Sequence, residues 1–239
     1  MMEELLPESV VAVESHGEEP AGEAGLYPEE RAVLTRAVGK RRREFATVRV
    51  CARRAMEKLG VAPGPVVPGE RGAPQWPAGV IGSMTHCEGY SAAALARAGD
   101  LASLGIDAEP HLTLPDDVLE VVALPGESDR LDRLHARVPG VHWDRLLFSA
   151  KESVYKAWFP LTGEWLDFSG ADIRISVDPA SGADSLSGDL SAQLLVPGPV
   201  VHGVRVQVLT GRWTVRRGLV ATAVTVPHTG PGRTPEPAA

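Results

Sequence analysis

The chain has 239 residues, of which 44% are hydrophobic and 23% are charged, and its formal net charge is −7 at pH 7. That length is enough for one large domain or two small ones with a buried core. The acidic balance argues against a general nucleic-acid binder, and the lack of an apolar run of about 18 residues argues against a membrane span.

The first part of the chain predicts a strand, an acidic loop and a helical region. Residues 9–13 form a short apolar strand after an acidic N-terminus, which lacks the basic start and long apolar core of a secretion signal. Between residues 27 and 60 the pattern is helical. Pro28 suits a first turn, Gly60 suits an end, and Gly39 divides the region into two helices or kinks one.

The remainder of the chain is predominantly β-like, with one clear helix. A loop rich in proline and glycine, residues 61–79, precedes β-like pieces at residues 79–86, 90–97 and 101–109. A weaker helical pattern near residues 115–122 and a polar stretch lead to a helix over residues 142–159. Strands of an antiparallel sheet are expected at residues 171–178, 191–196, 204–210, 212–218 and 219–226. We expect a disordered tail over residues 229–239.

Two segments of the sequence echo each other. Residues 85–97 and residues 211–226 each read as a turn that feeds a strand of small residues. This similarity hints at two related α+β halves that meet near residue 106.

The chain has only two cysteines, Cys51 and Cys87, in no metal-ligand spacing, and we expect a reducing, cytoplasmic setting.

The strand at residues 103–110, SLGIDAEP, ends with two acids separated by one alanine, Asp107 and Glu109. Side chains alternate faces along a strand, so both carboxylates point to the same side. Two like charges held so close repel each other unless a positive group lies between them. Taken alone, the segment favours a simpler interpretation, an ordinary polar turn at the end of a strand.

The helix over residues 142–159 has two different faces at about 100° per residue. One face would pack into a core and consists of Trp143, Leu147, Ala150, Val154 and Trp158. The opposite face is a narrow polar strip, flanked by aromatic side chains, and consists of Arg145, Ser149, Glu152 and Lys156. Aromatic flanks indicate a cleft; the alternative is a surface helix with an ordinary Glu152–Lys156 pair.

Asp107, Glu109 and Glu152 together offer three carboxylates. Carboxylate oxygens are the ligands that Mg²⁺ prefers where it shares its coordination sphere with phosphate. Lys151, Lys156 and several arginines would neutralise the phosphates. A divalent ion and fixed cations would stabilise phosphoryl transfer to a hydroxyl, and a general base would assist it.

The same residues resemble a known family, the 4′-phosphopantetheinyl transferases. The paired segments GIDAE (105–109) and FSAKESVYKAWF (148–159) are similar to its signature. Three further segments resemble its other motifs in the right order: RRREFATVRVCAR (41–53), ERGAPQWP (70–77) and VIGSMTHCEGYSAAAL (80–95). The resemblance covers roughly residues 30 to 170. It is to the broad-specificity type that serves siderophore, nonribosomal peptide and polyketide synthases in secondary metabolism.

This resemblance implies a fold and a reaction. The fold would be a pseudo-dimer of two similar α+β subdomains, residues 1–106 and 107–228, with coenzyme A and Mg²⁺ in the cleft between them. The reaction would be that of a holo-[acyl-carrier-protein] synthase. It transfers the 4′-phosphopantetheine arm of coenzyme A to a serine of an apo acyl or peptidyl carrier protein and releases 3′,5′-ADP. The family also implies a monomer, and the charge and apolar pattern described above predict no nucleic-acid or membrane partner.

The resemblance also implies roles for individual residues. Asp107, Glu109 and Glu152 would hold Mg²⁺, and Glu152, or a water that it orients, would take the proton of the carrier serine. Lys151 and Lys156 would contact the phosphates. The catalytic set would thus be Asp107, Glu152 and Lys156. The expected coenzyme A contacts are Arg41 (or Arg42 in its place), Arg49, Arg71, Gly72, Ala73, Pro74, Thr85, His86 and Leu166.

Two other functions compete with this interpretation. A noncatalytic module that binds coenzyme A or a carrier protein would keep the fold, but it has no need of Asp107, Glu109, Glu152 and Lys156 together. An unrelated Mg²⁺-dependent nucleotide enzyme, such as a kinase, would require a glycine-rich phosphate loop, and the sequence contains none.

Overall fold

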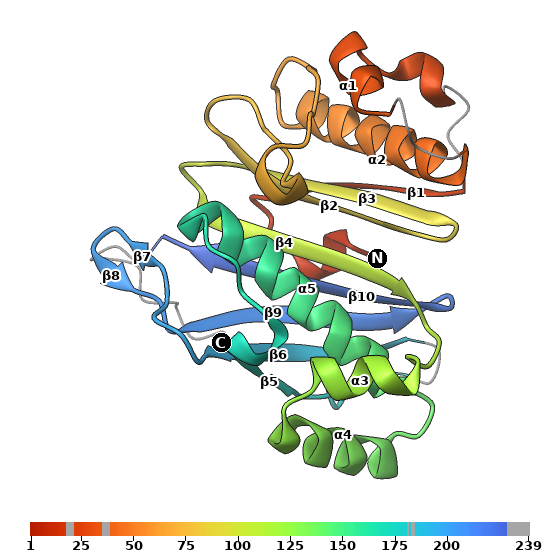
Figure 1. Cartoon of the computed structure of the whole chain (residues 1–239), viewed down its shortest axis with the longest axis vertical. Helices are drawn as coiled ribbons and strands as arrows, with labels where there is room; N and C mark the ends of the chain where they lie inside the picture. Colours follow the sequence, from red (N-terminus) through yellow and green to blue (C-terminus); the bar gives the residue numbers. More distant parts are fainter. Residues whose placement is uncertain (18–21, 35–38, 181, 183–184, 229–239) are drawn as a thin grey trace.

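The computed structural model describes residues 1–17, 22–34, 39–180, 182 and 185–228. In this part of the chain two antiparallel sheets lie one after the other, each covered by a long helix (Figure 1). The tail at residues 229–239, which was expected to be disordered, lies outside the described residues.

The first sheet has the strand order β1-β3-β2. Its strands are β1 (Val11–His16), β2 (Val80–Cys87) and β3 (Tyr90–Arg97), and the helix packed on it is α2 (Gly39–Lys58). A short α1 (Pro28–Val33) precedes α2, as the division at Gly39 predicted. Alternate residues of β3 face two cores: Ala93 and Leu95 pack under α2, whereas Ala92, Ala94 and Ala96 face the second sheet.

The second sheet has the strand order β4-β10-β9-β6-β5. Its strands are β4 (Leu101–Pro110), β5 (Ala171–Ile175), β6 (Leu186–Leu194), β9 (Val208–Arg216) and β10 (Leu219–Pro227), and α5 (Trp143–Thr162) packs on it. The predicted apolar face of α5, Trp143 to Trp158, is fully buried against this sheet. A separate small hairpin is formed by β7 (Val200–Val201) and β8 (Val204–Arg205).

Both sheets close in the same way. In each, the first strand pairs with the second strand of a hairpin: β1 with β3 of the β2–β3 hairpin, and β4 with β10 of the β9–β10 hairpin. These hairpins are the two segments whose sequences echo each other. The predicted boundary between residues 106 and 107 lies within β4, which pairs with β10 from Leu101 onward.

β2 and β4 lie side by side but share no backbone ladder in the described chain. Side-chain hydroxyls join them instead. Ser83 Oγ accepts a hydrogen bond from the Ile106 amide at 3.1 Å, and Thr85 Oγ1 accepts one from the Ala108 amide at 3.0 Å. We call this contact the hydroxyl seam; it is where the two halves of the molecule meet.

Two helices connect β4 to α5 on the outside of the second sheet (Figure 1). The weak pattern near residues 115–122 is α3 (Asp116–Val122), as predicted. α4 (Pro125–Arg137) was missed, because its Pro-Gly start reads as a loop. In the structure Pro125 occupies the first helical turn, where its missing N–H is not needed.

Candidate active site

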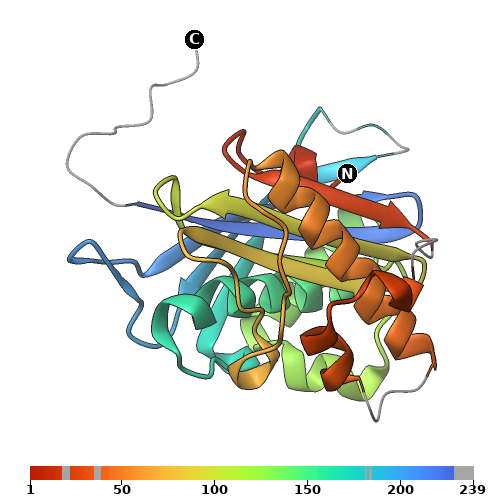
Figure 2. The same cartoon turned by 90° about the horizontal axis from the view of Figure 1, so that it is seen from above.

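The two halves of the molecule enclose a cavity of about 740 Å³. α2, β2 and the loop with η3 (Glu70–Gly72) form one wall, and α5 forms the other; both views place η3 beside α5 (Figures 1 and 2). The predicted site residues that line this cavity are Arg41, Arg49, Arg71, Gly72, Ala73, Pro74, His86, Glu152 and Lys156. Another cavity, of about 660 Å³, lies beside the N-terminal residues and β6, and contains no predicted site residue.

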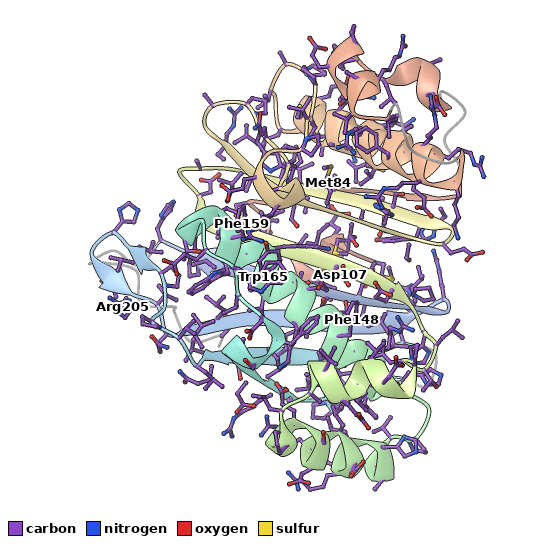
Figure 3. All side chains as sticks on the ribbon, viewed as in Figure 1. Met84, Asp107, Phe148, Phe159, Trp165 and Arg205 are labelled. Carbon is purple, nitrogen blue, oxygen red and sulfur yellow. The ribbon has the colours of Figure 1, made fainter. Side chains whose placement is uncertain are left out.

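Gly105 lets β4 approach α5 closely. A Cβ atom at this position would collide with the backbone carbonyl oxygen of Ser153. Two residues along the strand, Asp107 Oδ1 accepts a hydrogen bond from Lys156 Nζ at 2.7 Å. Asp107 is only 4% exposed, and its Oδ2 has no hydrogen-bond partner among the described residues. In Figure 3, Asp107 lies between Met84 of β2 and Phe148 of α5.

Glu109 is the second acid on the same face of β4. Its Oε2 accepts a hydrogen bond from Arg145 Nη1 at 3.1 Å. Burial, and after it the negative charge of Asp107, raises the pKa of Glu109 to about 7 against the opposing effect of Arg145 and Lys156. The repulsion that the sequence predicted is therefore present in the folded protein.

Glu152 lies one helical turn before Lys156 and faces the cavity. Its carboxylate makes no hydrogen bond or ion pair with any residue that the structure describes. Burial raises the pKa of Glu152; Lys156 opposes this rise and Asp107 adds to it. The third predicted acid therefore interacts electrostatically with the first.

The three carboxylates are ligands of the type that Mg²⁺ prefers, although they do not form a complete coordination shell. Among the described residues, no three carboxylate, imidazole or thiol groups converge closely enough to hold a metal ion as they stand. Mg²⁺ rarely uses such a cage, since it keeps several waters and takes one or two carboxylates together with substrate phosphate. The buried, unpartnered Oδ2 of Asp107 and the unpaired Glu152 are donors of that type.

The cations from α2 divide between the cavity and the surface. Arg41 and Arg49 line the cavity, whereas Arg42 turns away and forms an ion pair with Glu23 at 2.6 Å. Of the two arginines that the sequence left open, Arg41 is the one that faces the cavity. The Arg49 guanidinium lies over the Phe45 ring, and burial lowers its pKa to about 10, so it remains charged at neutral pH.

His86 and Thr85 are adjacent on β2 but have different surroundings. His86 faces the cavity with its Nδ1 3.6 Å from a Glu44 carboxylate oxygen, and burial lowers its pKa although Glu44 opposes this. Thr85, which was predicted to line the same pocket, does not line the cavity. Its hydroxyl belongs to the hydroxyl seam and also donates to Asp107 Oδ1 at 3.3 Å.

Comparison with known proteins assigns this arrangement to a family. The model of the 4′-phosphopantetheinyl transferase N-terminal domain matches residues 29–96, and that of the 4′-phosphopantetheinyl transferase superfamily matches residues 103–196. The 4′-phosphopantetheinyl transferase Svp of Streptomyces mobaraensis is 55% identical over 227 residues, which is 95% of this chain and 89% of that relative. The chain belongs to the 4′-phosphopantetheinyl transferase family.

Other relatives agree with this assignment. The 4′-phosphopantetheinyl transferase PptT of Mycobacterium tuberculosis is 44% identical over 222 residues, 92% of this chain and 95% of the relative. Enterobactin synthase component D of Salmonella typhi is 33% identical over 126 residues, about half of either chain. In this transferase, no helix of the described residues is long and apolar enough to cross a membrane.

Lys151 of the transferase is not placed where the resemblance implied. Its ammonium group lies 2.8 Å from Glu127 Oε2 and donates to the carbonyl oxygens of Phe168 at 2.6 Å and Ala171 at 3.0 Å. Burial lowers the pKa of Lys151 against the opposing effect of Glu127. Neighbouring helix residues differ by about 100°, so Lys151 points into the protein when Glu152 faces the cavity. We therefore correct the expected phosphate contact: Lys151 joins α5 to α4 and β5.

Leu166 lines a smaller cavity of about 140 Å³ next to Glu152. Trp165 and Tyr155 share that lining, and the Tyr155 hydroxyl has no hydrogen-bond partner among the described residues. The Arg71 guanidinium lies 5.3 Å from the centre of the Trp165 ring, so the loop with η3 reaches across to the segment after α5. The sequence offered no signal for this contact.

Ser149 was predicted to lie on the polar strip that faces the cleft, and this is wrong. Ser149 and Ser153 are completely buried, and both hydroxyls are hydrogen-bonded to the hydroxyl of Thr222 on β10, at 2.9 and 2.7 Å. Thr222 stands directly opposite Asp107 in the β4–β10 ladder. These hydroxyls therefore fix α5 to the strand pair that carries the acids.

Proposed function

We propose that this transferase moves the 4′-phosphopantetheine arm of coenzyme A to a serine of an apo carrier protein, with Mg²⁺ held by Asp107, Glu109 and Glu152. One observation supports the site most directly. Glu152 and Lys156 line one side of a cavity, Lys156 also donates to Asp107, and the other wall carries Arg41, Arg49 and His86. Such a cavity suits a ligand with several phosphates at one end and a reacting phosphorus atom at the other.

Each group in this site has a distinct task. A bound Mg²⁺ would reduce the charge repulsion at the pyrophosphate and stabilise the departing phosphate. Lys156, partly exposed to the cavity, is free to share its ammonium between Asp107 and a phosphate oxygen. Arg41 and Arg49 would bind the 3′-phosphate, and the loop of residues 71–74 would lie along the adenine.

Glu152 is suited to accept the proton of the carrier serine, directly or through a water molecule. Its carboxylate is unpaired among the described residues and faces the cavity, and burial raises its pKa toward the range useful for a general base. The serine oxygen then bonds to the phosphorus atom, the bond to the bridging oxygen of 3′,5′-ADP breaks, and the proton rests on Glu152.

We further propose the broad-specificity, holo-[acyl-carrier-protein] synthase type, acting on acyl and peptidyl carriers of siderophore, nonribosomal peptide and polyketide synthases. The name of the enterobactin synthase relative supports the siderophore part. The identical closure of the two sheets supports the pseudo-dimer, in which one chain builds the cleft and a monomer suffices. A cytoplasmic location fits the reduced cysteines.

Intact-protein mass spectrometry tests the proposal. An apo acyl carrier and an apo peptidyl carrier are each incubated with the enzyme, coenzyme A and Mg²⁺. Asp107→Ala and EDTA serve as controls. We expect each carrier to gain one phosphopantetheine group, and both controls to abolish the gain. No gain on either carrier, with coenzyme A still bound, would favour a noncatalytic binding module instead.

A further inference from the structure

Arg145 is an arginine of α5 that lies beside Glu109, one of the two acids of β4. It lies in the first turns of α5, and each nitrogen of its guanidinium has a separate acceptor. Nε donates to the Leu112 carbonyl oxygen at 3.0 Å, Nη2 to the Thr113 carbonyl oxygen at 3.2 Å, and Nη1 to Glu109 Oε2 at 3.1 Å. The two carbonyls belong to the segment that follows β4, so the guanidinium is fixed by main chain.

The two acids of β4 are held in the same manner. A cation binds one oxygen of each carboxylate, Lys156 on Asp107 Oδ1 and Arg145 on Glu109 Oε2. The other oxygen of each, Oδ2 and Oε1, has no hydrogen-bond partner among the residues that the structure describes. For Asp107 that oxygen is also buried. Each carboxylate is thus oriented by one oxygen and offers the second.

Lys156 and Arg145 nevertheless differ in freedom. Lys156 lines the cavity, and its flexible ammonium can turn from Asp107 to a ligand. Arg145 does not line the cavity, and two of its three contacts are main-chain carbonyl oxygens of the segment that follows β4. Lys156 is therefore placed to contact a bound ligand, whereas Arg145 is held by its hydrogen bonds to protein atoms.

We propose that Arg145 is a positioning residue of the metal site, which fixes the carboxylate of Glu109 so that its free oxygen, together with Asp107 Oδ2, binds the divalent cation. The inference rests on the proposed magnesium site and adds a residue to it that does not touch the ion. Partners that orient a ligating carboxylate in this way affect metal affinity by about 10- to 100-fold.

Arg145→Lys separates geometry from charge. Lysine keeps the positive charge but offers a single ammonium, which cannot span the two carbonyls and Glu109 as the planar guanidinium does. Arg137→Lys, on the exposed face of α4, is the matched control. Binding of Mn²⁺, used in place of Mg²⁺, is measured by electron paramagnetic resonance with coenzyme A present and no carrier.

We expect Arg145→Lys to weaken Mn²⁺ binding by about 10- to 100-fold, and Arg137→Lys to leave it unchanged. The Mg²⁺ concentration for half-maximal activity rises in parallel, while affinity for 3′,5′-ADP, which reports an intact cleft, stays at the wild-type value. Equal Mn²⁺ affinity in Arg145→Lys and wild type would overturn the positioning role alone. Absence of Mn²⁺ binding to the wild type would instead overturn the magnesium site itself.

Discussion

The ammonium group of Lys151 and the carboxylate of Glu127 form an ion pair at 2.8 Å with side-chain exposures of only 2% and 1%. The pair is saturated with hydrogen bonds, since Glu127 also accepts from the amides of Leu124 and Ile173. Such a pair is costly to break from one side, because the remaining charge stays buried without a partner. This relationship distinguishes Lys151 from Lys156, although both lie on the same helix.

Lys151→Met should therefore act on stability. We expect it to lower the free energy of unfolding by about 3–5 kcal/mol, and Lys151→Met combined with Glu127→Gln to cost less than the sum of the two single changes. Urea unfolding measures both effects. The folded fraction should bind coenzyme A normally, whereas Lys156→Met should bind it more weakly. A stable Lys151→Met protein with weakened coenzyme A binding would show that Lys151 is a phosphate ligand after all.

Gly105→Ala should disturb the contact between β4 and α5. The added methyl group would collide with backbone atoms of Ser153 and Ala157, which cannot rotate away. We expect a loss of at least about 1–3 kcal/mol, the usual cost of overpacking, measured as a lower midpoint of thermal unfolding. Gly99→Ala, which meets no atom within 4 Å, is the control. Equal midpoints for the two variants would refute this account of Gly105.

Arg41 and Arg42 should behave differently although they are adjacent. Arg41 faces the cavity and Arg42 is paired with Glu23. Arg41→Ala should weaken the binding of 3′,5′-ADP roughly 10- to 100-fold, as expected for the loss of about 1.5–3 kcal/mol from a charged hydrogen bond. Arg42→Ala should leave it within about twofold. Isothermal titration calorimetry provides both values, and a larger effect for Arg42 would reverse the assignment.

His86 should make coenzyme A binding depend on pH. Burial holds the pKa of His86 below its usual value of about 6.5, so protonation favours the unfolded chain, and stability is lost as the pH falls through the folded-state pKa. A bound phosphate beside the ring favours the imidazolium and raises this pKa. Binding then takes up a proton, and affinity increases as the pH falls below neutrality.

Calorimetry at about pH 6 in two buffers of different ionisation enthalpy measures that proton uptake. The difference between wild type and His86→Gln isolates the imidazole from the phosphates of coenzyme A, which titrate in the same range. We expect uptake by the wild type to exceed that of the variant. Identical uptake would exclude His86 as a phosphate contact.

The sequence predicted the parts of the site that obey local periodicity. Alternation along β4 put Asp107 and Glu109 on one face, and the helical period of α5 separated the buried Trp158 from Lys156. The family resemblance assigned Lys151 to the phosphates, and its contacts with Glu127 and Phe168 appear only in the folded structure. Periodicity is reliable here because it depends only on the chain itself.

What could not be predicted depends on which distant segment covers a residue. Ser149 lies on the polar strip by angle, but β10 passes over it and Thr222 satisfies its hydroxyl. The sequence showed Arg145 as one charged residue of the polar strip. Its carbonyl acceptors, Leu112 and Thr113, depend on how the chain runs after β4, which the sequence does not show. Glu127 lies in the first turn of α4, and the Pro-Gly start of this helix reads as a loop in the sequence. The buried ion pair between Glu127 and Lys151 could therefore not be predicted.

The hydroxyl of Thr85 serves two structures at once. It accepts the Ala108 amide across the hydroxyl seam and donates to Asp107 Oδ1. The position of the Asp107 carboxylate therefore depends on the same hydroxyl that joins the two halves. A separation of the halves at this joint would break both contacts and leave Lys156 as the remaining donor to Asp107 Oδ1.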